Sequence, residues 1–185
     1  MISSIQAYDG NKNRLKVKKV DKNSFMIFHS KRLKFLEYWV SDTWDHPEAK
    51  NDIWAMIGTN IQKGKNYILN TPGWFGYFEN YKGIPLILKI NYPGGLKPFT
   101  ALPFSEKIGD KSIFLAENYD HLIDSPIMIS KADTTIFYIG KTKVSIPIYH
   151  ENDKIDLSKL IKSKIEYFMR AVNIFCEDFN LDEYC

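Results

Sequence analysis

The 185-residue chain lacks the features that would assign it at once to a membrane or a disulfide-stapled class. Its 2 cysteines, Cys176 and Cys185, are too few for a disulfide framework and do not identify a redox compartment. No apolar run approaches the roughly 20 residues that cross a bilayer. The first residues have neither the basic start nor the apolar stretch of a signal peptide. We expect a soluble chain without a membrane partner, and the compartment stays open, with an exported or periplasmic parent protein allowed.

Charge of one sign is also scarce, because the formal net charge is only +3. The lysines are scattered and alternate with apolar residues, as in Arg-Leu-Lys-Val-Lys-Lys-Val at 14–20. A nucleic-acid-binding protein normally gathers its basic residues in one stripe. We therefore expect solvated charged faces and no nucleic-acid partner.

Histidine is rare, and no zinc-peptidase motif is present. Such a motif needs His-Glu-x-x-His, with two imidazoles one helical turn apart. His150-Glu151 begins this string, but Asp153 and Lys154 follow and no second histidine appears. The histidines lie in four separate segments, at His29, His46, His121 and His150. The sequence therefore predicts no catalytic residue, no metal ligand and no cofactor within this chain.

What the chain does have is aromatic residues, at 15% of the composition, which favours strands. Short apolar or alternating segments separated by polar breaks predict about a dozen strands before residue 150. The breaks Asp-Lys-Asn at 21–23 and Gly-Lys-Thr at 140–142 are typical of hairpins. The predicted strands are 14–20, 24–30, 33–40, 53–59, 66–70, 74–80, 84–92, 112–119, 125–130, 134–140 and 143–149.

From residue 156 the period changes to three and four, which predicts an amphipathic helix over 156–179 with Asp156 as its N-cap. The predicted fold is mainly β, an antiparallel β-sandwich followed by one long C-terminal helix. We divide the chain into a sandwich domain at 1–150 and a linker with the helix at 151–185.

One short stretch, Asn-Tyr-Asp-His-Leu-Ile-Asp-Ser-Pro at 118–126, concentrates residue types that serve in catalysis. A Ser-His-Asp triad could be drawn from Ser125, His121 and Asp120 or Asp124, as in a small hydrolase. However, Pro126 favours an extended conformation at Ser125, and no Gly-x-Ser-x-Gly elbow is present. We interpret Asp124 and Ser125 as residues that bond to local backbone groups in a turn.

The aromatic cluster over Trp74–Tyr81 has two interpretations. On a strand only alternate side chains share a face, so Trp74 and Phe78 would point away from Phe75. Packing of one side in the core is the simpler interpretation. The alternative is a freestanding β-sandwich module that binds glycan or peptide through these rings.

Taken in order, these segments resemble the N-terminal region of the glycyl aminopeptidase family, thermolysin-like zinc metallopeptidases that often carry a PDZ domain. The resemblance covers roughly residues 6–184, through stretches such as Tyr-Trp-Val-Ser-Asp-Thr-Trp-Asp at 38–45 and Thr-Ala-Leu-Pro-Phe at 100–104. Its most specific part is a junction motif near the end of the sandwich. That motif here consists of Tyr119, Asp120, Leu122, Asp124, Ser125, Pro126 and Ile127.

The resemblance implies a non-catalytic domain that supports a catalytic domain lying beyond Cys185, where zinc would be bound. The helix resembles the first helix on entering that domain. The family's sandwich usually begins some tens of residues earlier than this one. We expect the chain to be inactive alone and its partner to be its own catalytic domain. Without that partner, the apolar face of the 156–179 helix is expected to fold back on the sandwich or to form a homodimer.

Overall fold

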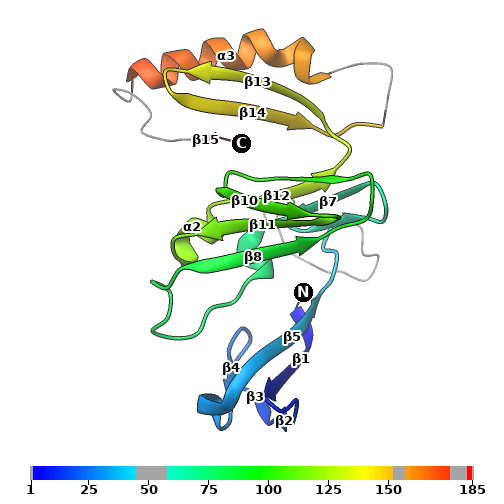
Figure 1. Cartoon of the computed structure of the whole chain (residues 1–185), viewed down its shortest axis with the longest axis vertical. Coiled ribbons are helices and arrows are strands. Elements are labelled where there is room, and N and C mark those ends of the chain that lie inside the picture. Colours follow the sequence, from blue (N-terminus) through cyan, green and yellow to red (C-terminus); the bar gives the residue numbers. More distant parts are fainter. Residues whose placement is uncertain (1, 45–57, 152–156, 176–182, 185) are drawn as a thin grey trace. The chain divides into compact units, whose positions relative to one another are not determined.

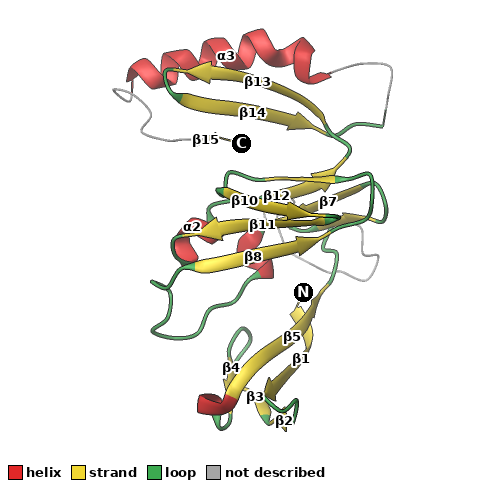
Figure 2. Ribbon diagram, viewed as in Figure 1, coloured by secondary structure: helices red, strands yellow, loops and turns green. Residues whose placement is uncertain are grey.

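In the computed structural model, the structure describes residues 2–44, 58–151, 157–175 and 183–184. The chain forms two compact units, Met1–Thr59 and Asn60–Cys185, which are described separately. Figure 1 follows the elements along the chain, and Figure 2 shows that strands predominate over helices in the described residues. The division at residue 150 stays a prediction.

The first unit is built from short antiparallel strands. One sheet has the order β2-β1-β5, and β3 and β4 form a separate hairpin. Ala7 on β1 and its cross-strand neighbour Leu15 on β2 are buried. The strands are β1 (Ile2–Asp9), β2 (Arg14–Leu15), β3 (Val17–Lys19), β4 (Phe25–Ile27) and β5 (Leu33–Val40).

The second unit contains a sandwich of two antiparallel sheets that share one apolar core. Their orders are β10-β11-β8 and β6-β7-β12-β9. Buried side chains from both sheets form the core, including Phe114 on β11 and Ile127 on β12. The elements are β6 (Asn60–Gln62), β7 (Asn66–Leu69), α1 (Thr71–Trp74), β8 (Leu86–Asn91), β9 (Lys97–Phe99), β10 (Phe104–Ile108), β11 (Lys111–Ala116), α2 (Tyr119–Ile123) and β12 (Ile127–Ser130).

The last part of the second unit is a hairpin covered by the long helix. β13 (Asp133–Ile139) and β14 (Thr142–Ile148) pair antiparallel, and β15 (Glu183–Tyr184) pairs parallel to β14. Helix α3 (Leu157–Phe175) lies along the two longer strands (Figure 1). Met169 of α3 is buried with Phe137 and Val144 of the hairpin. The helix thus places one apolar face on strands of its own unit.

The predicted architecture, mainly β and antiparallel with one long C-terminal helix, is confirmed. Both predicted hairpins exist, with β3 pairing β4 and β13 pairing β14. The segment 74–80 was wrongly predicted as a strand, since α1 ends at Trp74 and a loop follows. The predicted N-cap Asp156, the strand residues 53–57, Cys176 and Cys185 lie outside the described residues.

Candidate functional site: the junction motif

The stretch 118–126 folds into the short helix α2 and the turn that follows it. Asn118 is the N-cap, and its side-chain oxygen accepts a hydrogen bond from the His121 N–H at 2.9 Å. Asparagine is among the best N-cap residues because this bond satisfies a backbone donor that the helix leaves free. The sequence contains this signal, but the strand predicted over 112–119 is too long at its end, since β11 ends at Ala116 and α2 begins at Tyr119.

At the other end of α2, two hydroxyl groups bond to its last carbonyls. Ser125 Oγ donates to the His121 carbonyl oxygen at 2.9 Å. Thr71 Oγ1 donates to the Ile123 carbonyl oxygen at 2.8 Å. Both serine and threonine are buried, so these bonds replace water that cannot reach the helix end. Ser125 therefore acts as a local backbone partner, as its interpretation from sequence proposed.

The triad arrangement does not form. Ser125 bonds to the backbone carbonyl of His121 and not to its ring, and only 3% of Ser125 is exposed. The ring nitrogen Nδ1 of His121 instead accepts a hydrogen bond from the Glu117 N–H at 3.4 Å. A nucleophile needs a base within hydrogen-bond reach and an open path for the substrate. The geometry of Ser125 gives neither.

Tyr119 fastens a loop from a distant part of the chain. Its hydroxyl donates to the Phe75 carbonyl oxygen at 2.7 Å, and its backbone N–H donates to the Lys82 carbonyl oxygen at 2.8 Å. Its ring lies 4.9 Å from the ring of Tyr77 between centroids. The ammonium group of Lys82 lies 4.2 Å from the Tyr77 ring centroid and 5.6 Å from that of Tyr119. Tyr119 thus holds both ends of the 75–82 segment.

The remaining motif residues divide by burial. Leu122 and Ile127 belong to the core of the sandwich. Asp120, Asp124 and Pro126 are exposed. The motif therefore contributes apolar packing and backbone bonds on its inner side, and no set of catalytic groups converges on its outer side.

The aromatic cluster splits between core and surface. Trp74 and Phe75 pack against the sandwich core. Tyr77, Phe78 and Tyr81 are each about half exposed on the loop that follows α1. No local sequence signal could have revealed the roles of Thr71 and Phe75, because their partners lie 52 and 44 positions away.

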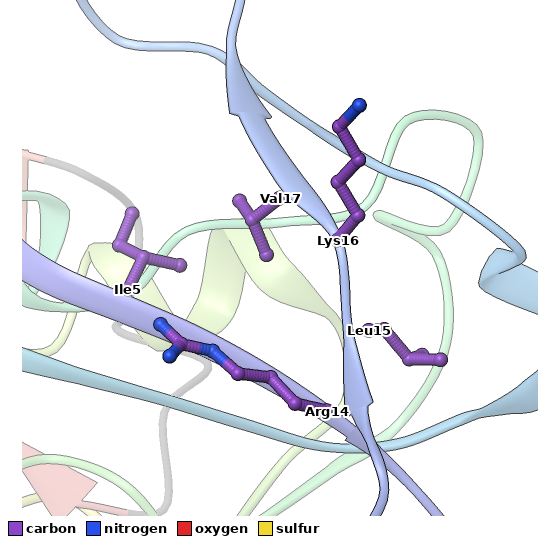
Figure 3. A pocket seen from close by; sticks show the side chains of 5 residues that line it. All are labelled: Ile5, Arg14, Leu15, Lys16 and Val17. Atoms are coloured by element: carbon purple, nitrogen blue, oxygen red, sulfur yellow. The ribbon is translucent and has the colours of Figure 1, made fainter.

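A shallow depression of about 400 Å³ lies in the first unit. It is wide open to solvent, and its lining consists of Ile5, Arg14, Leu15, Lys16 and Val17. Figure 3 shows Lys16 directing its ammonium group away from the other side chains. An open mixture of aliphatic and basic groups supplies neither enclosure nor convergent polar contacts for a small ligand.

Among the described residues, no three His, Cys, Asp or Glu side chains are grouped so that they could hold a metal ion. His150 and Asp133 form a pair, with the Nε2 and Oδ2 atoms 2.6 Å apart. Asp133 also accepts a hydrogen bond from the Leu157 N–H at 3.2 Å, which ties the pair to the start of α3.

Asp9 is a buried acidic group of the first unit that is held by several hydrogen bonds. Its carboxylate accepts hydrogen bonds from the backbone N–H groups of Asn13 and Asn11, each at 2.9 Å. The Asn13 side chain and Arg32 bond to the second oxygen. The bond from the Asn13 backbone is the largest cause that lowers the pKa of Asp9, while burial opposes it. These bonds close the turn between β1 and β2.

No described helix is long and apolar enough to span a membrane. The fold is a mainly β domain in which the junction motif, despite its catalytic residue types, fixes a helix and a loop. The comparison with protein families is more specific. The family model of the Peptidase M61 N-terminal domain matches residues 1–131, and the chain belongs to this family. It is therefore a peptidase-associated N-terminal domain, as the resemblance in its sequence implied.

A solved structure has the same fold. It is the crystal structure of an aminopeptidase N family protein from Idiomarina loihiensis, with a TM-score of 0.77 and 21% sequence identity. The match covers 99% of this chain and 30% of that chain, so the present chain spans less than a third of that protein's length. None of the curated proteins compared with the chain matches it.

Proposed function

We propose that this chain is the non-catalytic N-terminal domain of a glycyl-aminopeptidase-like zinc metallopeptidase and that it supports the catalytic domain. The observation that carries the proposal is the family match over residues 1–131. The junction motif agrees with it, since Tyr119 and Ser125 are used for backbone bonds that shape the domain. The catalytic domain would be the partner, and zinc would be bound there.

Supporting a catalytic domain requires a rigid surface beside the cleft. The loop at 75–82 is held at both ends by Tyr119, which reduces the entropy lost when its exposed rings are covered. Asp120 stands exposed on the neighbouring helix. In this proposal the motif and the loop form the side of the domain that limits one wall of the cleft.

The test is an assay of the purified chain with glycine p-nitroanilide, with and without added zinc, together with its metal content by mass spectrometry. The proposal predicts no hydrolysis and no stoichiometric zinc. It also predicts zinc-dependent aminopeptidase activity for a longer protein that contains this sequence. Stoichiometric zinc in the chain, or hydrolysis by it, would contradict the proposal.

A second candidate function is a module that binds glycan or peptide through the loop aromatics. It is favoured by the exposure of Tyr77, Phe78 and Tyr81, and weakened by the packing of Trp74 and Phe75 on the core. Titration with oligosaccharides and apolar peptides, followed by intrinsic fluorescence, decides between the two. Binding that is lost in Tyr81→Ala supports the module, and no spectral change excludes it.

A further inference from the structure

Three buried side-chain oxygens of the second unit have no hydrogen-bond partner among the described residues. They are Asn60 Oδ1, Asn66 Oδ1 and Ser130 Oγ. Ser130 is fully buried, and Asn66 and Asn60 are only 3% and 8% exposed. Because roughly 90% or more of the buried polar groups in folded proteins are hydrogen-bonded, three unpaired oxygens in one region point to a bound molecule.

The three residues lie on one sheet, and two of them are direct cross-strand neighbours. Ser130, at the end of β12, pairs with Asn66, at the start of β7. Figure 1 shows these two strands side by side. Asn60 of β6 pairs with Ile68 of β7, two residues along from Asn66. Directly opposite residues on one face have Cβ atoms about 4.5–5.5 Å apart, so the oxygens of Asn66 and Ser130 are close neighbours.

These side chains lie on the face of the sheet that points away from the sandwich core. Ile129, next to Ser130, belongs to the core, and Tyr67, next to Asn66, packs against it. Since successive side chains of a strand alternate between faces, Ser130 and Asn66 lie on the opposite face. Their oxygens are already sealed from the surface. A domain packed on the outside of the unit would therefore not supply their partners.

We propose that an internal water molecule binds between β7 and β12, held by Asn66 Oδ1 and Ser130 Oγ, with Asn60 Oδ1 as its third partner. An amide oxygen only accepts hydrogen bonds, whereas a serine hydroxyl also donates one. The water donates one hydrogen to each asparagine and accepts the hydrogen of Ser130. Three bonds are about the usual number for a buried water molecule.

The spacing and the charge of the site both favour water. A water that bonds to two oxygens at about 2.8 Å each, with a tetrahedral angle, joins atoms about 4.5 Å apart, which matches the spacing of cross-strand neighbours. All three groups are neutral. Ca²⁺ takes about six to eight oxygen ligands, with carboxylates prominent among them, so this set suits water better than a metal cation.

The water has a structural role beside the junction motif. β12 begins at Ile127, the last residue of that motif, and β7 leads into α1, where Thr71 bonds to the end of α2. A molecule bonded to β6, β7 and β12 therefore fixes the strands from which these segments start. This role goes beyond the proposed function, because it concerns the interior of the sandwich.

The first experiment is a crystal structure of the whole chain at a resolution that shows ordered waters. The expected result is one peak at about 2.7–3.2 Å from both Asn66 Oδ1 and Ser130 Oγ. Crystals grown in rubidium chloride distinguish water from a monovalent cation. An anomalous peak at the site, or a direct bond between Asn66 and Ser130 without a peak, overturns the proposal.

The second experiment counts internal waters in solution by the magnetic relaxation dispersion of oxygen-17 water. Ser130→Val removes the donor and fills its space, so the number of long-lived waters should fall by about one. The matched control is Ser145→Val, at a serine of β14 that is 9% exposed, which should leave the number unchanged.

An unchanged number in a folded Ser130→Val variant overturns the proposal, and so does an equal fall in the control. If the circular dichroism spectrum shows that Ser130→Val does not fold, the crystal structure of the unmodified chain decides the question. These results do not bear on the proposed function, which is tested by zinc content and hydrolysis.

Discussion

The hydroxyl of Tyr119 donates a hydrogen bond of 2.7 Å to the carbonyl oxygen of Phe75, a residue 44 positions earlier. The same tyrosine donates its backbone N–H to Lys82, so one residue of the junction motif sets both ends of the aromatic loop. The motif therefore works as an architectural element. Residue types that suggest catalysis are used here to join two segments that are far apart in the sequence.

Replacing this tyrosine tests that role. Tyr119→Phe keeps the buried ring and removes the donor to Phe75, so we expect the free energy of unfolding to fall by about 1 kcal/mol. Urea denaturation measures the change. Tyr81→Phe, at a ring that is 61% exposed, is the control and should change little. Equal stability of the two variants would show that the hydroxyl does not hold the loop.

The start of α3 depends on Asp133. Its Oδ2 atom accepts hydrogen bonds from His150 at 2.6 Å and from the Leu157 N–H at 3.2 Å. Asp133→Asn removes the charge that strengthens both bonds, and we expect a loss of about 1–2 kcal/mol. Hydrogen exchange should accelerate in the first turns of α3 more than in the sandwich. Uniform acceleration across both regions would contradict the assignment to α3.

The turn between β13 and β14 requires a left-handed residue. Gly140 has φ +58°, a conformation that costs other residues about 1–2 kcal/mol. Gly140→Ala should therefore lower the thermal midpoint. Gly83→Ala is the matched control, because a Cβ there meets nothing within 4 Å and the backbone φ is not in the left-handed region. A larger loss for the control would be the unexpected outcome.

The low pKa of Asp9 links stability to pH. Because the folded state holds the carboxylate ionised, the unfolded state binds more protons in acid, and stability falls as the pH drops. The stabilisation is complete above the usual aspartate pKa of about 3.9 and is lost as the pH falls through the lower value of the folded state. Asp9→Asn should show a smaller loss of stability between about pH 5 and about pH 2.

Urea denaturation at a series of pH values measures the slope of the free energy of unfolding against pH. Arg32→Gln removes a single partner of the carboxylate and should give an intermediate slope, since the bonds from Asn13 and Asn11 remain. An Asp9→Asn variant with the wild-type slope would place the acid sensitivity elsewhere in the chain.

Local patterns predicted the regular elements well where the pattern and the environment agreed. The strand predicted at 33–40 is β5, and the helix predicted from the three-and-four spacing is α3. Strand 143–149 corresponds to β14 at Thr142–Ile148. In β14 and α3 the apolar side of the pattern meets a core. In β5 no side chain is buried, and its strand conformation is set by pairing with β1.

The prediction failed where short polar or aromatic segments depend on distant partners. Residues 74–80 have strand-like composition, yet α1 and a loop form there because Thr71, Trp74 and Phe75 bind to α2 or the core. The first strand, β1, was not predicted; only Ala7 and Tyr8 pair with the neighbouring β2, and most of its pairing is with β5, which follows after the β3–β4 hairpin. Propensity is a weak guide when pairing is decided elsewhere in the chain.

The sequence by itself determined the mainly β architecture, the C-terminal helix and the unsuitability of Ser125, which precedes Pro126, as a nucleophile, because each follows from local period or backbone restriction. The family resemblance came from the likeness of its motifs, above all the junction motif. Only the tertiary structure decided that Tyr119 holds the aromatic loop and that Asp133 anchors the start of α3. These depend on which residues meet after the chain has folded, and their separations in sequence leave no local signal. The physical reason is that hydrogen bonding and burial are properties of neighbours in space.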